Sequence, residues 1–105
     1  MLNIIENEYI RFSVNDTFLM TVTNGDDTPF TDGAHLRFII AKSEQSETLI
    51  DKMYSLDENG VFKLSLTEQD KKKIPIGLYV YKIMIHSGGQ VITMQSGYFE
   101  VIWGE

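Results

Sequence analysis

Two histidines are the first residues of this chain whose chemistry could support catalysis. His35 opens one alternating stretch and His86 closes another. A serine hydrolase needs its nucleophile on a strained turn beside a histidine base, and the chain has no G-x-S-x-G element that would form such a turn. Lone histidines at strand ends are ordinarily polar strand termini. The histidines therefore predict neither a catalytic nor a metal-binding role.

The acidic turns invite comparison with calcium sites. Asp57-Glu58-Asn59-Gly60 supplies oxygen atoms, but an EF-hand loop needs ligands at alternate positions over about twelve residues. Alternating strand sequence already resumes at Val61, so we expect a solvated turn that glycine closes. Asp26, Asp27 and Asp32 lie in neighbouring turns. Calcium bridging between loops at one end of the domain stays an open alternative.

The residues for other catalytic chemistries are missing or badly placed. The chain has no cysteine, which excludes disulfides, thiol catalysis and thiolate metal sites. A glycosidase needs two carboxylates across a cleft, for which so small a domain has little room. Gly77 precedes a strand rather than a helix and so makes no phosphate-binding loop. We therefore expect a protein that is not an enzyme and holds no cofactor or metal.

The charge balance argues against a nucleic-acid partner. The chain has 15 acidic and 9 basic residues, for a formal net charge of −6. Such a domain repels a phosphate backbone unless a local basic patch overrides the overall sign. The basic cluster Lys71-Lys72-Lys73 follows Glu68 and Asp70, a mixture typical of a solvated face.

Nothing in the sequence predicts export or a membrane partner. The N-terminal residues lack a basic region, and Glu6 interrupts their apolar run. No stretch approaches the roughly 18 consecutive apolar residues of a membrane span. We expect no signal peptide and synthesis in the cytoplasm. Any appearance outside the cell would then follow lysis or incorporation into a larger particle.

The elements that position these residues are strands, because the hydrophobic pattern repeats every two residues. The alternating runs are Thr17–Thr23, Leu36–Ala41, Val61–Leu66, Leu78–His86, Val91–Gln95 and Tyr98–Trp103. Leu78–His86 is apolar on both faces for most of its length, which predicts a central strand. Gly88 and Gly89 separate two such runs and predict a tight primed turn, since glycine accepts positive φ freely.

One helical turn is predicted over residues 67–73. Thr67 can act as the N-cap, and Asp70 three residues later completes a capping box. Pro75 ends the helix, because the residue before a proline avoids the α region. Tyr79 follows Pro75 by four residues, the arrangement of a tyrosine corner whose hydroxyl bonds to the upstream backbone. We assign a structural role to Tyr79, Gly77, Gly88 and Gly89.

Together these features predict a single domain, residues 1–105, near the commonest domain size. Strands of about 5–8 residues with turns every 8–12 residues are typical of a sandwich or a barrel. With the tyrosine corner, we expect an all-β, immunoglobulin-like antiparallel sandwich of about seven or eight strands.

Aromatic residues supply the candidates for a binding surface, because tyrosine and tryptophan are enriched at interfaces. The candidate interface residues are Tyr9, Arg11, Tyr54, Tyr98 and Trp103. We expect the Trp103 ring to pack on the sandwich, with a role in partner binding as the alternative. Edge strands are expected around Tyr9–Phe12 and Leu49–Tyr54, where Asp51 and Lys52 would act as gatekeepers against unwanted pairing.

The order of these motifs resembles a known family. The matching segments are Asn7-Glu8-Tyr9-Ile10, Asp16-Thr17-Phe18, Leu36 to Lys42, Gly60 to Leu64, Leu66 to Asp70, Ile76 to Ile83 and Gly97 to Val101. Over almost its whole length the chain is similar to small immunoglobulin-like proteins among the virion genes of phages and prophages of Gram-positive bacteria. Their nearest named relative is the N-terminal domain of the phage baseplate upper protein. In that family the strand after the helix typically reads Leu-x-x-Gly-x-Tyr-x-Tyr, as Ile74 to Tyr81 nearly does.

The resemblance implies a non-catalytic structural module associated with a phage tail or baseplate. It would dock onto other virion structural proteins, onto itself, or onto both. A ligand-binding or adhesion module that recognises carbohydrate or a surface protein is the alternative, because immunoglobulin-like sandwiches also host such sites in their end loops.

Overall fold

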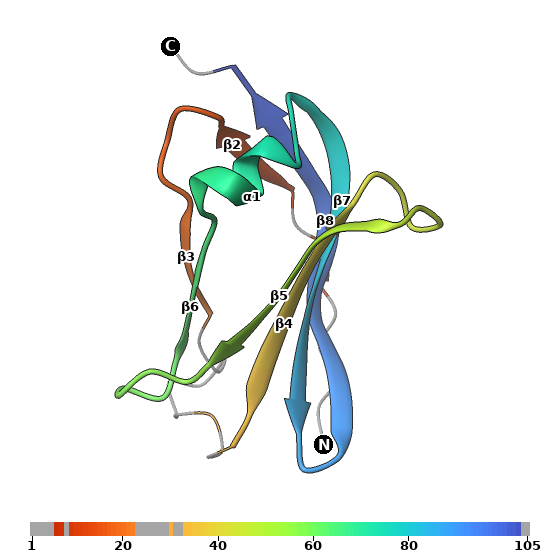
Figure 1. Ribbon diagram of the computed structural model, residues 1–105. Coiled ribbons are helices and arrows are strands. Elements are labelled where there is room, and N and C mark those ends of the chain that lie inside the picture. Colours follow the sequence, from red (N-terminus) through yellow and green to blue (C-terminus); the bar gives the residue numbers. More distant parts are fainter. Residues whose placement is uncertain (1–5, 8, 23–29, 31–32, 104–105) are drawn as a thin grey trace.

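Two β-sheets face each other across a core in the computed structural model, which describes residues 6–7, 9–22, 30 and 33–103 (Figure 1). The elements are β1 (Glu6–Asn7), β2 (Ile10–Ser13), β3 (Leu19–Val22), β4 (His35–Ala41), β5 (Thr48–Ser55), β6 (Phe62–Ser65), α1 (Glu68–Lys72), β7 (Gly77–Ser87) and β8 (Gln90–Ile102). The large sheet has the order β1-β8-β7-β4-β5 with β2 also on β8, and β3 pairs with β6. The predicted all-β, sandwich-like fold with one short helix is confirmed.

One edge of the large sheet departs from the expected antiparallel pattern. Both β1 and β2 run parallel to β8, and Ile10 lies opposite Phe99 in that register. The other pairings among the described strands are antiparallel. The prediction of a wholly antiparallel sandwich was therefore wrong at this edge. Side chains alternate in the same way in both kinds of pair, so the sequence pattern carries no information on strand direction.

Aromatic rings fill the centre of the core. The rings of Phe18 and Phe38 stack with centroids 6.1 Å apart, and Phe12 meets Phe18 edge-on at 5.3 Å. Phe99 is fully buried beside Phe38 and Tyr81, with centroid distances of 6.3 and 6.2 Å. Such ring pairs contribute about 0.5–1.5 kcal/mol beyond the area that they bury. Through Phe18 the cluster joins the large sheet to the segment that precedes β3.

The short helix α1 bridges one end of the sandwich (Figure 1) and carries the predicted capping box. The Thr67 hydroxyl accepts a bond from the Asp70 backbone N–H at 3.1 Å, and the Asp70 carboxylate accepts one from the Thr67 N–H at 2.9 Å. The same carboxylate accepts a bond from Lys52 Nζ at 2.8 Å. The helix is therefore anchored to β5 through Lys52, which points inward from that strand.

The predicted tyrosine corner is present at the start of β7. The Tyr79 hydroxyl donates to the Pro75 carbonyl at 2.5 Å, and the ring itself is buried. Lys42 Nζ, from the loop after β4, lies 4.9 Å from the centroid of this ring and 3.4 Å from the Leu78 carbonyl. Gly77 opens the strand in the space between Lys42 and the ring. The tyrosine corner thus joins the segment before β7 to the loop after β4.

The predicted hairpin between β7 and β8 is confirmed. Gly88 has φ of 57° and Gly89 has φ of 80°, and Ser87 lies opposite Gln90. Two consecutive positive φ values are the requirement of a type I′ turn, whose twist matches that of the flanking strands. An added Cβ at either position would meet no atom within 4 Å, so conformation rather than space demands glycine there.

We expect Tyr79→Phe to lower the free energy of unfolding by about 1 kcal/mol, because it removes one intramolecular hydrogen bond and little buried area. Urea denaturation followed by circular dichroism measures this loss. The matched control is Tyr98→Phe, since the Tyr98 ring is 54% exposed and should tolerate the change within about 0.5 kcal/mol. Equal losses in the two variants would contradict a special role for the Tyr79 hydroxyl.

Acid should weaken the domain through Asp70. Burial alone raises the pKa of this carboxyl, but the bonds from Lys52 and Thr67 outweigh burial and the net pKa is lowered. A lowered pKa stabilises the fold above the unfolded value near 3.9, and this contribution is lost as the pH falls through the folded-state pKa. Urea titrations from about pH 5 downward should therefore show a smaller loss of stability in Asp70→Asn than in the unaltered protein. Identical pH slopes would refute the effect.

Candidate functional site

The outer face of the large sheet, the side turned away from β3 and β6, gathers most of the exposed large apolar side chains. In β4 the residues Leu36, Phe38 and Ile40 belong to the core, so Arg37 and Ile39 point outward. The exposed large apolar and aromatic residues of this face and its β2 edge are Tyr9, Met53, Leu78, Val91 and Tyr98. Leu78 and Val91 lie near opposite ends of the β7–β8 ladder, whereas Tyr9 and Tyr98 lie together, with ring centroids 6.5 Å apart.

Strand register arranges the outward residues in rows across the sheet. One row runs from Ala41 through Val80 to Tyr98. The next runs from Ile39 through Lys82 to Ser96. Because directly opposed residues in antiparallel strands lie side by side, each row is a contiguous strip of surface.

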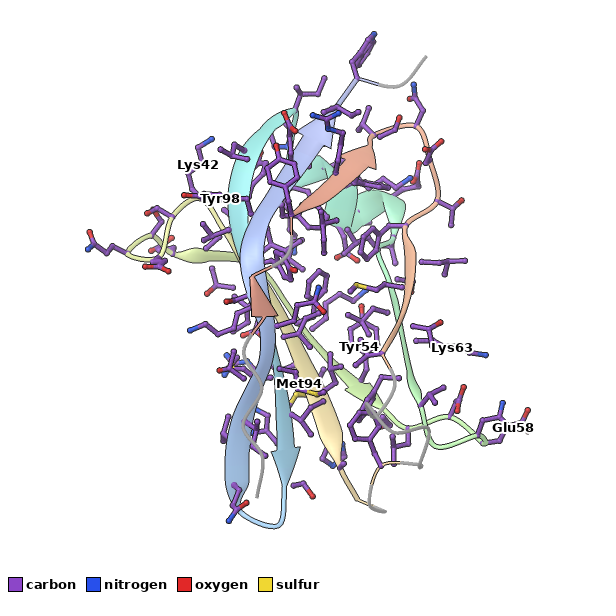
Figure 2. The ribbon with its side chains drawn as sticks, turned by 180° about the vertical axis from the view of Figure 1, so that it is seen from behind. Lys42, Tyr54, Glu58, Lys63, Met94 and Tyr98 are labelled. Atoms are coloured by element: carbon purple, nitrogen blue, oxygen red, sulfur yellow. The ribbon has the colours of Figure 1, made fainter. Side chains whose placement is uncertain are left out.

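These rows form the floor of a wide depression of about 1190 Å³, here called the outer hollow. Half-buried Ile39, Val80 and Met84 line it together with the exposed Lys82. Tyr9 and Tyr98 lie on one side of the hollow, and the loop of residues 42–47 between β4 and β5 lies on the other. That loop extends away from the sandwich in Figure 1. Lys42 and Tyr98, although on opposite sides of the hollow, both lie on the outer face of the large sheet, as Figure 2 shows.

A polar cluster lies at the β2 edge of the hollow. Glu100 Oε1 accepts a short hydrogen bond from the Tyr9 hydroxyl and a second bond, of 3.2 Å, from Arg11 Nε. The bond from Tyr9 and that from Arg11 outweigh desolvation and lower the pKa of Glu100. The ring of Tyr98 lies 6.5 Å from that of Tyr9. The structure therefore brings together three of the predicted interface residues, Tyr9, Arg11 and Tyr98.

The other two candidates lie apart from this cluster. Tyr54 is half-buried on the inward side of β5, between the two sheets (Figure 2). Its hydroxyl donates to the Ser65 carbonyl at 2.6 Å and accepts from the Ser65 N–H at 3.3 Å. Trp103 follows β8 and is 72% exposed, so the expectation that its ring packs on the sandwich was wrong. The last register pairs of β8 end at Ile102, and the ring lies beyond them.

The floor of the hollow was missed at the sequence level, although its signal was present. Leu78–His86 is apolar on both faces, and we interpreted this only as the mark of a central strand. The strand is indeed central, between β4 and β8. Its outward Leu78, Val80 and Met84 nevertheless keep part of their surface in solvent. Lys82 interrupts them and is the signal that this side is not a second core.

The predicted edges and gatekeepers can also be placed. β5 closes one end of the large sheet, and β1 and β2 lie on β8 at the other. Asp51 forms two bonds with Arg37, of 2.9 and 2.6 Å, on the outward side of β5. Lys52 turns inward, and an inward charge on an edge strand disfavours pairing with another chain.

Asp57, which was weighed for calcium binding, makes structural contacts within its own turn. Asp57 Oδ1 accepts bonds from the Asn59 and Val61 N–H groups, at 2.8 and 3.2 Å, as expected of a closed turn. Within the described part of the chain, no three histidine or acidic side chains are grouped so that they could hold a metal ion. Asp26, Asp27 and Asp32 lie outside the described residues, so calcium bridging there stays untested. No described helix is long and apolar enough to cross a membrane.

Comparison with known proteins finds likeness in structure only. No protein-family model matches the chain, and no curated protein sequence matches it. The N-terminal domain of phage TP901-1 ORF48 shares 12% identity and a TM-score of 0.55, over 91% of this chain and 87% of that domain. At this identity the likeness shows a shared fold.

Two further solved structures are more distant. The endo-β-1,4-mannanase from Thermotoga petrophila shares 15% identity at a TM-score of 0.49, over 98% of this chain and 18% of the enzyme. An uncharacterized protein from Bacillus anthracis strain Ames shares 15% identity at a TM-score of 0.48, over 92% of this chain and 86% of that protein. Neither carries an argument about function at these TM-scores.

The polar cluster predicts a change in the titration of Tyr9. The hydrogen bond to Glu100 raises the pKa of the Tyr9 phenol, helped by burial and by the negative charge of Glu100. Glu100→Gln removes that charge and should lower the pKa of Tyr9. NMR of ring-labelled tyrosine would follow each phenol separately through an alkaline titration, and Tyr9→Phe assigns the signal. An unchanged pKa of Tyr9 in Glu100→Gln would show that the two groups do not interact in solution.

Proposed function

We propose that this chain is a non-catalytic assembly module of a phage or prophage particle, associated with the tail or baseplate. The observation that carries the proposal is the mutual coverage with the phage TP901-1 ORF48 domain, 91% of this chain and 87% of that one. The likeness therefore extends over most of both chains. The resemblance of the sequence motifs to the phage immunoglobulin-like family agrees with this proposal.

The surface chemistry fits a docking role. The outer hollow and the polar cluster beside it present exposed aromatic rings next to fixed charges, and aromatic residues and arginine are enriched in protein interfaces. Partners would be other virion structural proteins, this chain itself, or both. The chain would be made in the cytoplasm and become associated with the particle on assembly.

A second candidate is a ligand-binding or adhesion module, for which the outer hollow with its exposed Tyr98 is the favouring observation. Tyrosine rings at the rim of a depression can stack on sugars, and neighbouring hydroxyls such as those of Ser43 and Thr93 can bond to them. A glycan array separates the two candidates, because only the adhesion module should bind defined sugars in the absence of other proteins.

The assembly role predicts that the chain co-purifies with particles. Particles induced from the strain that encodes it and banded on a density gradient should contain the chain in fixed ratio to other structural proteins, as measured by quantitative mass spectrometry. Tyr98→Arg should reduce incorporation at least about tenfold, because a charge replaces an exposed ring at the hollow.

Leu19→Arg is the matched control for that experiment. Leu19 is 72% exposed on β3, in the opposite sheet, so the substitution adds the same charge away from the hollow. It should leave incorporation unchanged. If the unaltered protein itself stayed in the particle-free fractions, the assembly role would be rejected.

A further inference from the structure

Lys82 differs from the arginines on the same face of the sheet. Arg37 pairs with Asp51 at 2.6 Å, and Arg11 pairs with Glu100 at 3.2 Å. Lys82 makes no ion pair with any side chain that the structure describes. The residue is exposed and lines the outer hollow.

The surroundings of Lys82 are largely apolar and recessed. Ser96 lies directly opposite on β8. The apolar neighbours are Ile39, directly opposite on β4, and Val80 and Met84, which lie two residues before and after Lys82 on β7. All three side chains are half-buried and line the hollow. An ammonium amid aliphatic and methionine side chains matches a carboxylate flanked by apolar groups. These described floor residues are not aromatic, so the floor fits side chains better than a stacked sugar ring.

Shape and charge argue against a second copy as the occupant. A two-fold interface brings the same patch of each subunit together. If the two-fold axis passed through the middle of the hollow, Lys82 would lie near its own counterpart, and like charges facing each other are destabilising. A convex partner fills the depression and can bring the opposite charge.

The charge of the hollow also differs from that of the chain. The chain carries a formal net charge of −6, whereas the described charged residues that line the hollow are Lys42, Glu44 and Lys82, and the Arg11–Glu100 pair at its edge is balanced. An acidic segment is therefore attracted to this part of the surface more than to the domain as a whole.

We infer that the outer hollow binds an extended polypeptide segment of a partner protein. An aspartate or glutamate of that segment forms an ion pair with Lys82, and apolar side chains on either side of the acid cover Ile39, Val80 and Met84. The aromatic side at Tyr9 and Tyr98 and the loop of residues 42–47 would hold the segment from either side. The inference deepens the proposed function. It rests on that function for one point, that the partner is a protein.

Selection of a random twelve-residue peptide library on the purified domain tests which peptide sequences the hollow binds. The unaltered domain should enrich peptides with an acidic residue between apolar ones. Lys82→Glu should bind those peptides at least about tenfold more weakly, because attraction becomes repulsion, and should enrich peptides with lysine or arginine instead. Lys72→Glu, an exposed charge reversal on α1, should select the same peptides as the unaltered domain.

Location is tested with the best enriched peptide. Amide hydrogen exchange should show protection of residues 78–84 and 93–98 and none of β3 or β6. Failure to enrich any peptide, enrichment without charge preference, an unchanged selection by Lys82→Glu, or protection elsewhere would each overturn the inference.

Light scattering on the domain alone tests the rival occupant. A dimer that Tyr98→Arg dissociates would assign the hollow to a second copy and overturn the inference; a monomer supports it. The peptide selection, the hydrogen exchange and the light scattering all use the purified domain without particles. A negative peptide result therefore leaves co-purification with particles standing as evidence for assembly, and failed co-purification leaves the peptide result standing.

Discussion

The pairing of β7 with β4 on one side and β8 on the other is the constraint on which the rest of the molecule depends. β7 runs from Gly77 to Ser87, and its register sets Tyr81, Ile83 and Ile85 into the core. The same register turns Val80, Lys82 and Met84 outward. A slip of one residue would exchange the two sets and place the Lys82 ammonium in the core. Core packing and the chemistry of the outer face therefore follow from one alignment.

Long-range polar contacts hold the ends of this sheet in place. Tyr79 and Lys42 join the entry of β7 to the loop after β4, and that loop forms one side of the outer hollow. At the β5 edge, Lys52 and Asp70 join the sheet to α1. The surface proposed for docking thus stands on a backbone that is fixed at several points, which limits the entropy lost when a partner binds.

The two proposals rest on separate kinds of evidence. Assembly into a particle is supported by the extent of the structural likeness to a phage domain and by the order of sequence motifs. Peptide recognition is supported by the shape of the outer hollow and by one exposed ammonium among apolar side chains. Fold likeness alone says little about function, and the residues of the hollow make the proposed role specific.

The sequence by itself determined the local structure. Thr67 with Asp70, Tyr79 with Pro75, and the glycine pair at the β7–β8 turn act through neighbours at most four residues away, so local patterns were enough. Tertiary structure alone decided the parallel pairing of β2 with β8, the exposure of Trp103 and the grouping of Tyr9 with Glu100. The strand pairing and the grouping of Tyr9 with Glu100 depend on contacts between residues about ninety positions apart. Period-two alternation shows that a strand has two faces, but only the packed sheets show which face stays in water.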